Sequence, residues 1–323
     1  MNQSVDSERG LVAALVDDGR PLIKLTGIAL IGSGLFAFFL AATGHFLPHD
    51  IAFLGMSAGE LYTIADGRLV HFMMHDRVSF GGAILGVGTL YLWLAEFPLR
   101  ARQPWAWCAL LLSGTVGFAS FLAYLGYGYL DTWHGIATIV LLPMFVGGLI
   151  KTFALVRPLP PVGALLRPGS TMDLRSAYGV GRLLLLVTSC CLVLGGLIIM
   201  TVGMTSVFVP QDLEFMHICA ADLQAVSPRL IPLIAHDRAG FGGGVCCCGL
   251  TMLCCIYFSP PSRSLWQALA ITGAAGFGTA IGVHYPIGYL SLSHLLPAYF
   301  GGFMFVSGMA LTFPRMMLRR TEN

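Results

Sequence analysis

Stretches of about 20 apolar residues dominate this sequence and limit the folds that it can adopt. An α-helix rises about 1.5 Å per residue, so about 20 residues cross the roughly 30 Å of hydrocarbon in a bilayer. The stretches are continuous and rich in Leu, Ala and Gly, a pattern typical of membrane helices and not of barrel strands. Eight are recognised: 22–44, 78–97, 104–126, 134–156, 183–209, 239–258, 265–284 and 294–314. Only 11% of the residues are charged, against about 25% in soluble domains. We therefore expect an all-α integral membrane protein with eight transmembrane helices.

Basic residues indicate how this protein lies in the bilayer. If both termini are inside, the inner segments hold 14 of the 18 Lys and Arg residues, and the outer loops hold Arg68, Arg77, Arg229 and Arg238. The excess predicts a multi-pass protein of the cell inner (plasma) membrane with both termini cytoplasmic. It also explains the net charge of +2, so the lipid bilayer is the expected partner and nucleic acid is not. All nine histidines then lie at the outer face.

The sequence repeats itself at an offset of about 160 residues. His75-Asp76-Arg77 aligns with His236-Asp237-Arg238, and His134 aligns with His294. The repeat predicts two parallel four-helix bundles. The expected segments are a cytoplasmic tail 1–21, a first bundle 22–156, a Pro/Arg-rich cytoplasmic linker 157–182, a second bundle 183–314 and a cytoplasmic tail 315–323. In the first outer loop, Ser57 and Glu60 have capping-box spacing, which predicts a short surface helix.

Four histidines occupy matched positions in the two copies. His75 and His134 begin the second and fourth helices of the first copy, and His236 and His294 begin those of the second. Diagonal helices of a four-helix bundle face each other, so each pair could ligate a haem iron from both sides. Small residues follow on the faces of His75 and His236 and predict room for the macrocycle; they include Gly82, Gly86 and Gly243. We therefore expect one or two b-type haems near the outer face, with an oxidoreductase or electron-transfer role and a quinone or another redox membrane protein as partner.

Other interpretations fit the same residues. His71 and His75 are four residues apart and could bind a divalent metal or non-haem iron with Glu60 or His134. In such a metalloenzyme for a lipid-soluble substrate, Glu60 and His71 are the candidate catalytic residues. Alternatively, the histidines only anchor helix ends in a non-catalytic scaffold or assembly factor.

Several features restrict these alternatives. Asp76 and Asp237 either orient the neighbouring imidazoles or pair with Arg77 and Arg238 as surface ions. His217 and His284 do not follow the repeat, which predicts peripheral positions.

No charged residue lies at the middle of any predicted span, which disfavours a proton pump or an ion-coupled transporter. Eight of the nine cysteines lie within predicted helices, so we expect no disulfide framework.

The arrangement resembles the haem A synthase family, in which a histidine begins the second and fourth helices of each of two duplicated bundles. The resemblance covers most of the chain in topology. Its motifs are limited to His75, His134, His236 and His294, with Arg77 and Arg238 following closely. It implies a first half that oxidises a methyl group of haem O to the formyl group of haem A between His75 and His134. It also implies a haem b between His236 and His294. Phe72 stands where the family has a glutamate, and the first outer loop lacks the family's cysteine pair.

Overall fold

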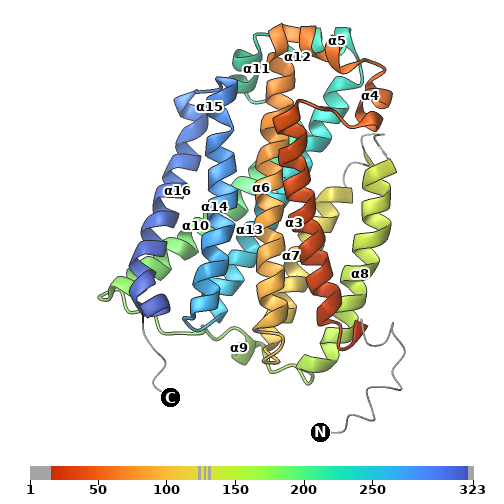
Figure 1. The fold of residues 1–323 in the computed structure, drawn as a ribbon. Coiled ribbons are helices and arrows are strands. Elements are labelled where there is room, and N and C mark those ends of the chain that lie inside the picture. Colours follow the sequence, from red (N-terminus) through yellow and green to blue (C-terminus); the bar gives the residue numbers. More distant parts are fainter. Residues whose placement is uncertain (1–15, 123–124, 127–128, 130–131, 319–323) are drawn as a thin grey trace.

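The computed structural model describes residues 16–318, except 123–124, 127–128 and 130–131. The described residues form helices and connecting segments, without a strand. Seven helices are long and apolar enough to cross a membrane, so the chain is a multi-pass helical membrane protein. They are built on α3 (Arg20–Thr43), α6 (Arg68–Glu96), α7 (Pro104–Leu122), α8 (Thr132–Val156), α10 (Ala177–Met204), α13 (Leu230–Phe258) and α16 (Leu292–Phe313). The remaining apolar stretch forms α14 (Arg263–Gly282), which lies beside α16 (Figure 1).

The second and sixth predicted helices begin earlier than their apolar stretches do. α6 begins at Arg68 and not at residue 78, and α13 begins at Leu230 and not at residue 239. Both His-Asp-Arg motifs therefore lie inside long helices and not at their N-terminal ends. The helices can continue past the apolar residues because the motif side chains find buried partners, which are described below.

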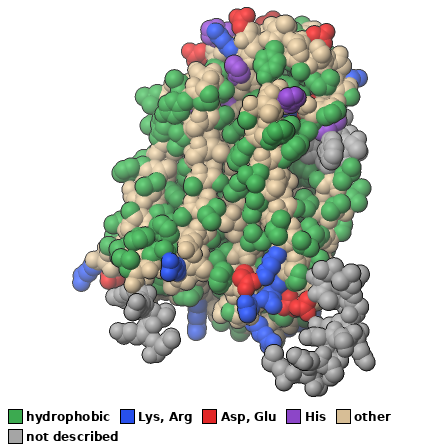
Figure 2. All heavy atoms as spheres, viewed as in Figure 1, with side chains coloured by type: hydrophobic (Ala, Val, Ile, Leu, Met, Phe, Trp, Pro, Cys, Tyr) green, Lys and Arg blue, Asp and Glu red, His purple; other side chains and the backbone are tan. Residues whose placement is uncertain are grey.

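Short helices cover the end of the molecule where the histidines lie. They are α4 (Pro48–Leu54), α5 (Ala58–Thr63), η1 (Ile64–Gly67), α11 (Pro210–Met216), α12 (Ala220–Val226) and α15 (His284–Ile287). The predicted capping box of α5 is confirmed, since Ser57 Oγ accepts from the Glu60 amide and the Glu60 carboxylate accepts from the Ser57 amide at 2.6 Å. On the face drawn in Figure 2, histidines lie at this end and most Lys and Arg residues at the other. That other end carries α9 (Val162–Leu165) and η3 (Pro314–Leu318).

The long helices pack as two lobes that share α6 and α13. These two helices contact each other; α3 packs on α6, α7 packs on α13, and α8 contacts both α3 and α7. We call α3, α6, α7, α8 and α13 the first lobe. On the other side α10 packs on α13, α14 packs on α6, and α16 contacts both α10 and α14. We call α6, α10, α13, α14 and α16 the second lobe. The two halves of the sequence therefore interleave, since α6 packs on α14 and α13 packs on α7.

Glycines allow this interleaving. A Cβ atom on Gly82 would lie 1.9 Å from Oγ1 of Thr279 on α14, and one on Gly86 would lie 2.9 Å from Cγ2 of Thr272. A Cβ atom on Gly243 would lie 1.8 Å from Oγ of Ser120 on α7. The space that the sequence assigned to a macrocycle is thus filled by neighbouring helices, because small residues let helices approach closely.

Candidate metal centre

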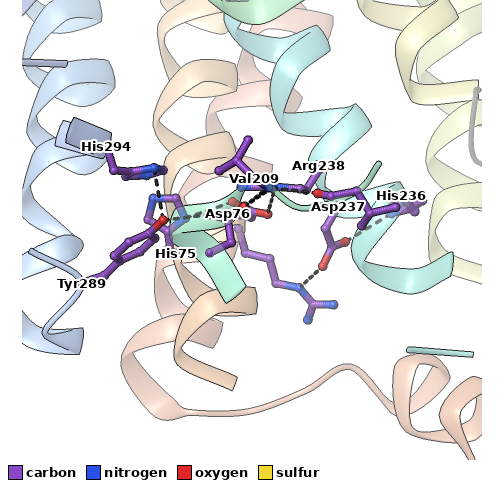
Figure 3. A network of polar contacts seen from close by, with 11 residues as sticks. His75, Asp76, Val209, His236, Asp237, Arg238, Tyr289 and His294 are labelled. Carbon is purple, nitrogen blue, oxygen red and sulfur yellow. Dashed lines mark hydrogen bonds and ion pairs between the residues drawn. The ribbon is translucent and has the colours of Figure 1, made fainter. Parts of the chain in front are cut away.

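The two His-Asp-Arg motifs bind each other across the contact between α6 and α13. Arg238 Nε lies 3.2 Å from Asp76 Oδ2, and Arg77 Nε donates to Asp237 Oδ2 at 3.0 Å. Figure 3 shows Asp76, Asp237 and Arg238 within this network of polar contacts. Asp76 is 1% exposed and Arg238 is 6% exposed. The Asp76–Arg238 pair is therefore a buried link between the two halves, and the Arg77–Asp237 pair is a partly buried one, with side chains 14% and 12% exposed. Neither is the surface ion pair within one motif that was considered from the sequence.

Each arginine also binds a carboxylate on a short helix. Arg77 Nη1 lies 2.8 Å from Asp50 Oδ2 on α4, and Arg238 Nη1 donates to Asp212 Oδ2 on α11 at 2.5 Å. Buried charges cost free energy unless they are paired, and the charges of Arg77 and Arg238 each face two carboxylates. This reciprocal arrangement explains why the Asp-Arg part of the motif occurs in both halves.

A tyrosine completes the arrangement in each lobe. Tyr129 donates to Asp50, and Tyr289 donates to Asp212 Oδ1 at 2.8 Å. Burial raises the pKa of Asp50, but Arg77 and the Tyr129 hydrogen bond outweigh burial and hold this pKa below its ordinary value. Burial and the neighbouring carboxylate raise the pKa of Tyr289. The tyrosine is therefore protonated and acts as a donor at neutral pH.

Three histidines converge in the second lobe beside this network. They are His75 on α6, His284 at the start of α15 and His294 on α16. Their ring centroids lie 4.4 Å apart for His75 and His284, 5.3 Å for His284 and His294, and 5.7 Å for His75 and His294. One nitrogen of each ring lies within 4.8 Å of the other two, the one such group of three metal-binding side chains found among the described residues. His75 and His284 are buried.

Two of the three imidazoles are oriented by partners typical of metal ligands. His75 Nδ1 lies 3.0 Å from Asp76 Oδ1, and His294 Nδ1 lies 3.2 Å from the Tyr289 hydroxyl (Figure 3). A carboxylate can only accept, so His75 Nδ1 carries the proton and Nε2 keeps its lone pair. Tyr289 donates to Asp212 and so accepts from His294. Metal-binding histidines commonly donate their second ring nitrogen in this way.

The third imidazole, His284, has no comparable partner. Both of its ring nitrogens are buried and neither makes a hydrogen bond of normal geometry. Burial, together with the nearby imidazoles of His75 and His294, lowers the pKa of His284 to about 3, although the Ala280 carbonyl and Asp76 act in the opposite direction. A neutral imidazole with an unused lone pair, buried between two others, fits a metal ion.

The structure regroups the histidines that the sequence paired. His294 lies with His75, whereas the sequence paired it with His236. His236 faces the first lobe, where its Nδ1 lies 3.2 Å from Asp237 Oδ1 and its ring lies 5.0 Å from that of Tyr129. The side chain of His134 lies outside the described residues.

The residues of the alternative metal site stay apart from the trio. Glu60 is exposed and caps α5 with Ser57. His71 lies on α6, partly exposed, one turn before His75, and is not among the three converging histidines. The prediction that His284 is peripheral is wrong, because its side chain is buried and lies with His75 and His294. The repeat places no histidine opposite His284 in the first copy, so comparison of the copies did not favour it as a ligand. The sequence feature that could have indicated it is its position ten residues before His294, at the same end of the molecule.

Comparison with protein-family models, curated proteins and solved structures finds no match for this chain. The likeness to haem A synthases therefore remains an expectation from the sequence.

Proposed function

We propose that this chain is a membrane metalloprotein with an oxidoreductase role, which holds a divalent transition metal ion through His75, His284 and His294 near the outer face. The convergence of three imidazoles, two of them buried and that of His294 partly buried, carries this proposal. Neutral imidazoles suit zinc, copper and non-haem iron. Three protein ligands leave a coordination position open for water or substrate, as in catalytic metal sites. Copper or iron would supply electron transfer for this role, whereas zinc has no redox chemistry and would supply Lewis acidity alone. Asp76 and Tyr289 would orient the imidazoles of His75 and His294.

A metal ion fits the trio better than a haem does. Axial histidines of a haem lie on opposite faces of a flat macrocycle. Here a macrocycle between any two of the three rings would meet the third, because the three nitrogens lie within 4.8 Å of one another. Thr272 and Thr279 of α14 also fill the space beside Gly86 and Gly82.

We further propose eight spans, with α14 as the eighth and both termini cytoplasmic in the plasma membrane. The length of α14, 20 residues, and its packing against α6 and α16 support the eighth span. An internal duplication is supported by the matched contacts of Arg77 with Asp50 and Asp237, and of Arg238 with Asp212 and Asp76.

Metal analysis of the purified full-length protein tests the proposed site. We expect about one equivalent of zinc, copper or iron in the wild type. His284→Ala should lose at least tenfold in metal affinity, whereas His71→Ala, a matched change one turn along α6 from His75, should keep wild-type affinity. Metal lost in His71→Ala and kept in His284→Ala would instead support the site built from Glu60 and His71.

A reduced-minus-oxidised absorption spectrum separates the metal proposal from the haem hypothesis. The proposed centre predicts no b-type bands in the purified protein. Bands that disappear in His75→Ala or His236→Ala would favour haem.

A further inference from the structure

A cavity of about 360 Å³ lies inside the first lobe. All five helices of that lobe line it, and most of its wall is apolar. Contributing side chains include Leu30 and Phe36 of α3, Phe80 and Ile84 of α6, Phe118 of α7 and Leu141 of α8. Its volume falls within the range of about 300–1,000 Å³ that small-molecule sites occupy. Because this apolar wall belongs to membrane-crossing helices, it favours a ligand with an apolar, lipid-soluble part.

Polar groups border this cavity at the histidine end. Asp50, Arg77, His236 and Asp237 all line it. Arg77 is already bound by both carboxylates, at 2.8 Å to Asp50 and 3.0 Å to Asp237. Two carboxylates and one guanidinium sum to one negative charge, so the polar end disfavours an anionic headgroup. Carboxylate oxygens and an imidazole are well suited to bind hydroxyl groups.

We propose that the cavity binds a lipid-soluble quinol, with its ring hydroxyls toward Asp50, His236 and Asp237 and its hydrocarbon tail among the apolar side chains. A quinol has an uncharged headgroup with two hydroxyl donors and an apolar tail, which matches both ends of the cavity. Binding does not depend on a metal at His75, His284 and His294, and so this inference goes beyond the proposed metal centre. The two sites are nonetheless close neighbours in structure, since Asp76 and Arg77 are consecutive on α6 and each pairs with α13.

Gly240 offers a precise way to fill the cavity. It lines the cavity, and a Cβ atom there would meet no atom within 4 Å. Gly240→Leu therefore places a side chain in the cavity without a clash at the backbone. Gly278 on α14 is exposed and equally free of neighbours, so Gly278→Leu is the matched control. Ala137→Leu fills the same cavity from α8 and serves if Gly240→Leu fails to fold.

Binding is measured on the full-length protein in nanodiscs with decylubiquinol, and with lauric acid as an anionic probe of similar tail length. We expect saturable binding of decylubiquinol, at least tenfold weaker in Gly240→Leu and Ala137→Leu and unchanged in Gly278→Leu. Lauric acid should bind at least tenfold more weakly than decylubiquinol. Metal content is measured in the same samples and should be unchanged in Gly240→Leu, so that failure at one site is distinguished from failure at the other.

Three outcomes would overturn the proposal. The first is wild-type protein that does not bind decylubiquinol. The second is binding that survives both cavity-filling changes. The third is another occupant of the cavity, shown by equal binding of lauric acid or by a haem spectrum that Gly240→Leu abolishes.

Discussion

Asp50 illustrates how a single carboxylate supports the polar end of the first lobe. It is 1% exposed and bound by Arg77 and Tyr129. Because its folded pKa lies below the ordinary 3.8, its contribution to stability is present above about pH 4 and is lost as the pH falls through the folded pKa.

Asp50→Asn should remove that dependence on pH. We expect the variant to be less stable than the wild type at pH 7, with a smaller loss of stability between about pH 4 and pH 2, because no carboxylate titrates at this position. Thermal unfolding in detergent across this pH range measures the effect. If Asp50→Asn and the wild type lose the same amount of stability between about pH 4 and pH 2, this prediction is wrong.

At the scale of helices, the reciprocal ion pairs hold α6 against α13. Arg77→Ala leaves Asp50 and Asp237 buried without their cation, which typically costs about 3–5 kcal/mol of unfolding free energy. Arg100→Ala removes an exposed pair with Glu96, four residues away on the chain, and should cost less than about 1 kcal/mol. Unfolding by denaturing detergent compares the two variants, and equal losses would show that the buried pair does not stabilise the helix contact.

Two adjacent glycines on α10 test how closely the helices pack. A Cβ atom on Gly196 would lie 2.4 Å from the Cys246 amide nitrogen of α13, whereas one on Gly195 would meet nothing within 4 Å. Gly196→Ala should therefore destabilise the protein by about 1–3 kcal/mol relative to Gly195→Ala. Both changes alter helix propensity equally, so the difference in unfolding midpoint reports packing alone. Similar midpoints would contradict the close approach of α10 and α13.

For the whole molecule, the distribution of histidine and basic residues predicts which end faces outward. Cys219 is exposed at the histidine end, at the N-cap of α12. A membrane-impermeant maleimide should label it in intact spheroplasts, and Cys219→Ser should abolish this labelling. Labelling only after the membrane is permeabilised would reverse the proposed topology.

The helical membrane fold could be predicted from the sequence, because the length of an apolar stretch and the thickness of a bilayer are directly related. The capping box at Ser57 and Glu60 could also be predicted, because its partners are three residues apart. The contacts between the long helices could not be predicted from the sequence. The repeat relates His75 to His236 and His134 to His294, but it does not reveal that α6 and α13 are shared between lobes.

The candidate site depends on that sharing. His75 comes from the first half, yet it meets His284 and His294 of the second. His284 has no counterpart in the repeat, so a comparison of the two copies pointed away from it. The glycines at 82, 86 and 243 likewise have two physical uses, room for a ligand or close helix contact, and only the neighbouring side chains distinguish between them.

X-ray absorption at the edge of the bound metal tests the central claim most directly, since it counts the ligands themselves. We expect three imidazole nitrogens at about 2.0–2.1 Å if the metal is zinc, and one imidazole fewer in metal-reconstituted His284→Ala. Sulfur ligands, a haem iron, or an unchanged imidazole count in His284→Ala would contradict it.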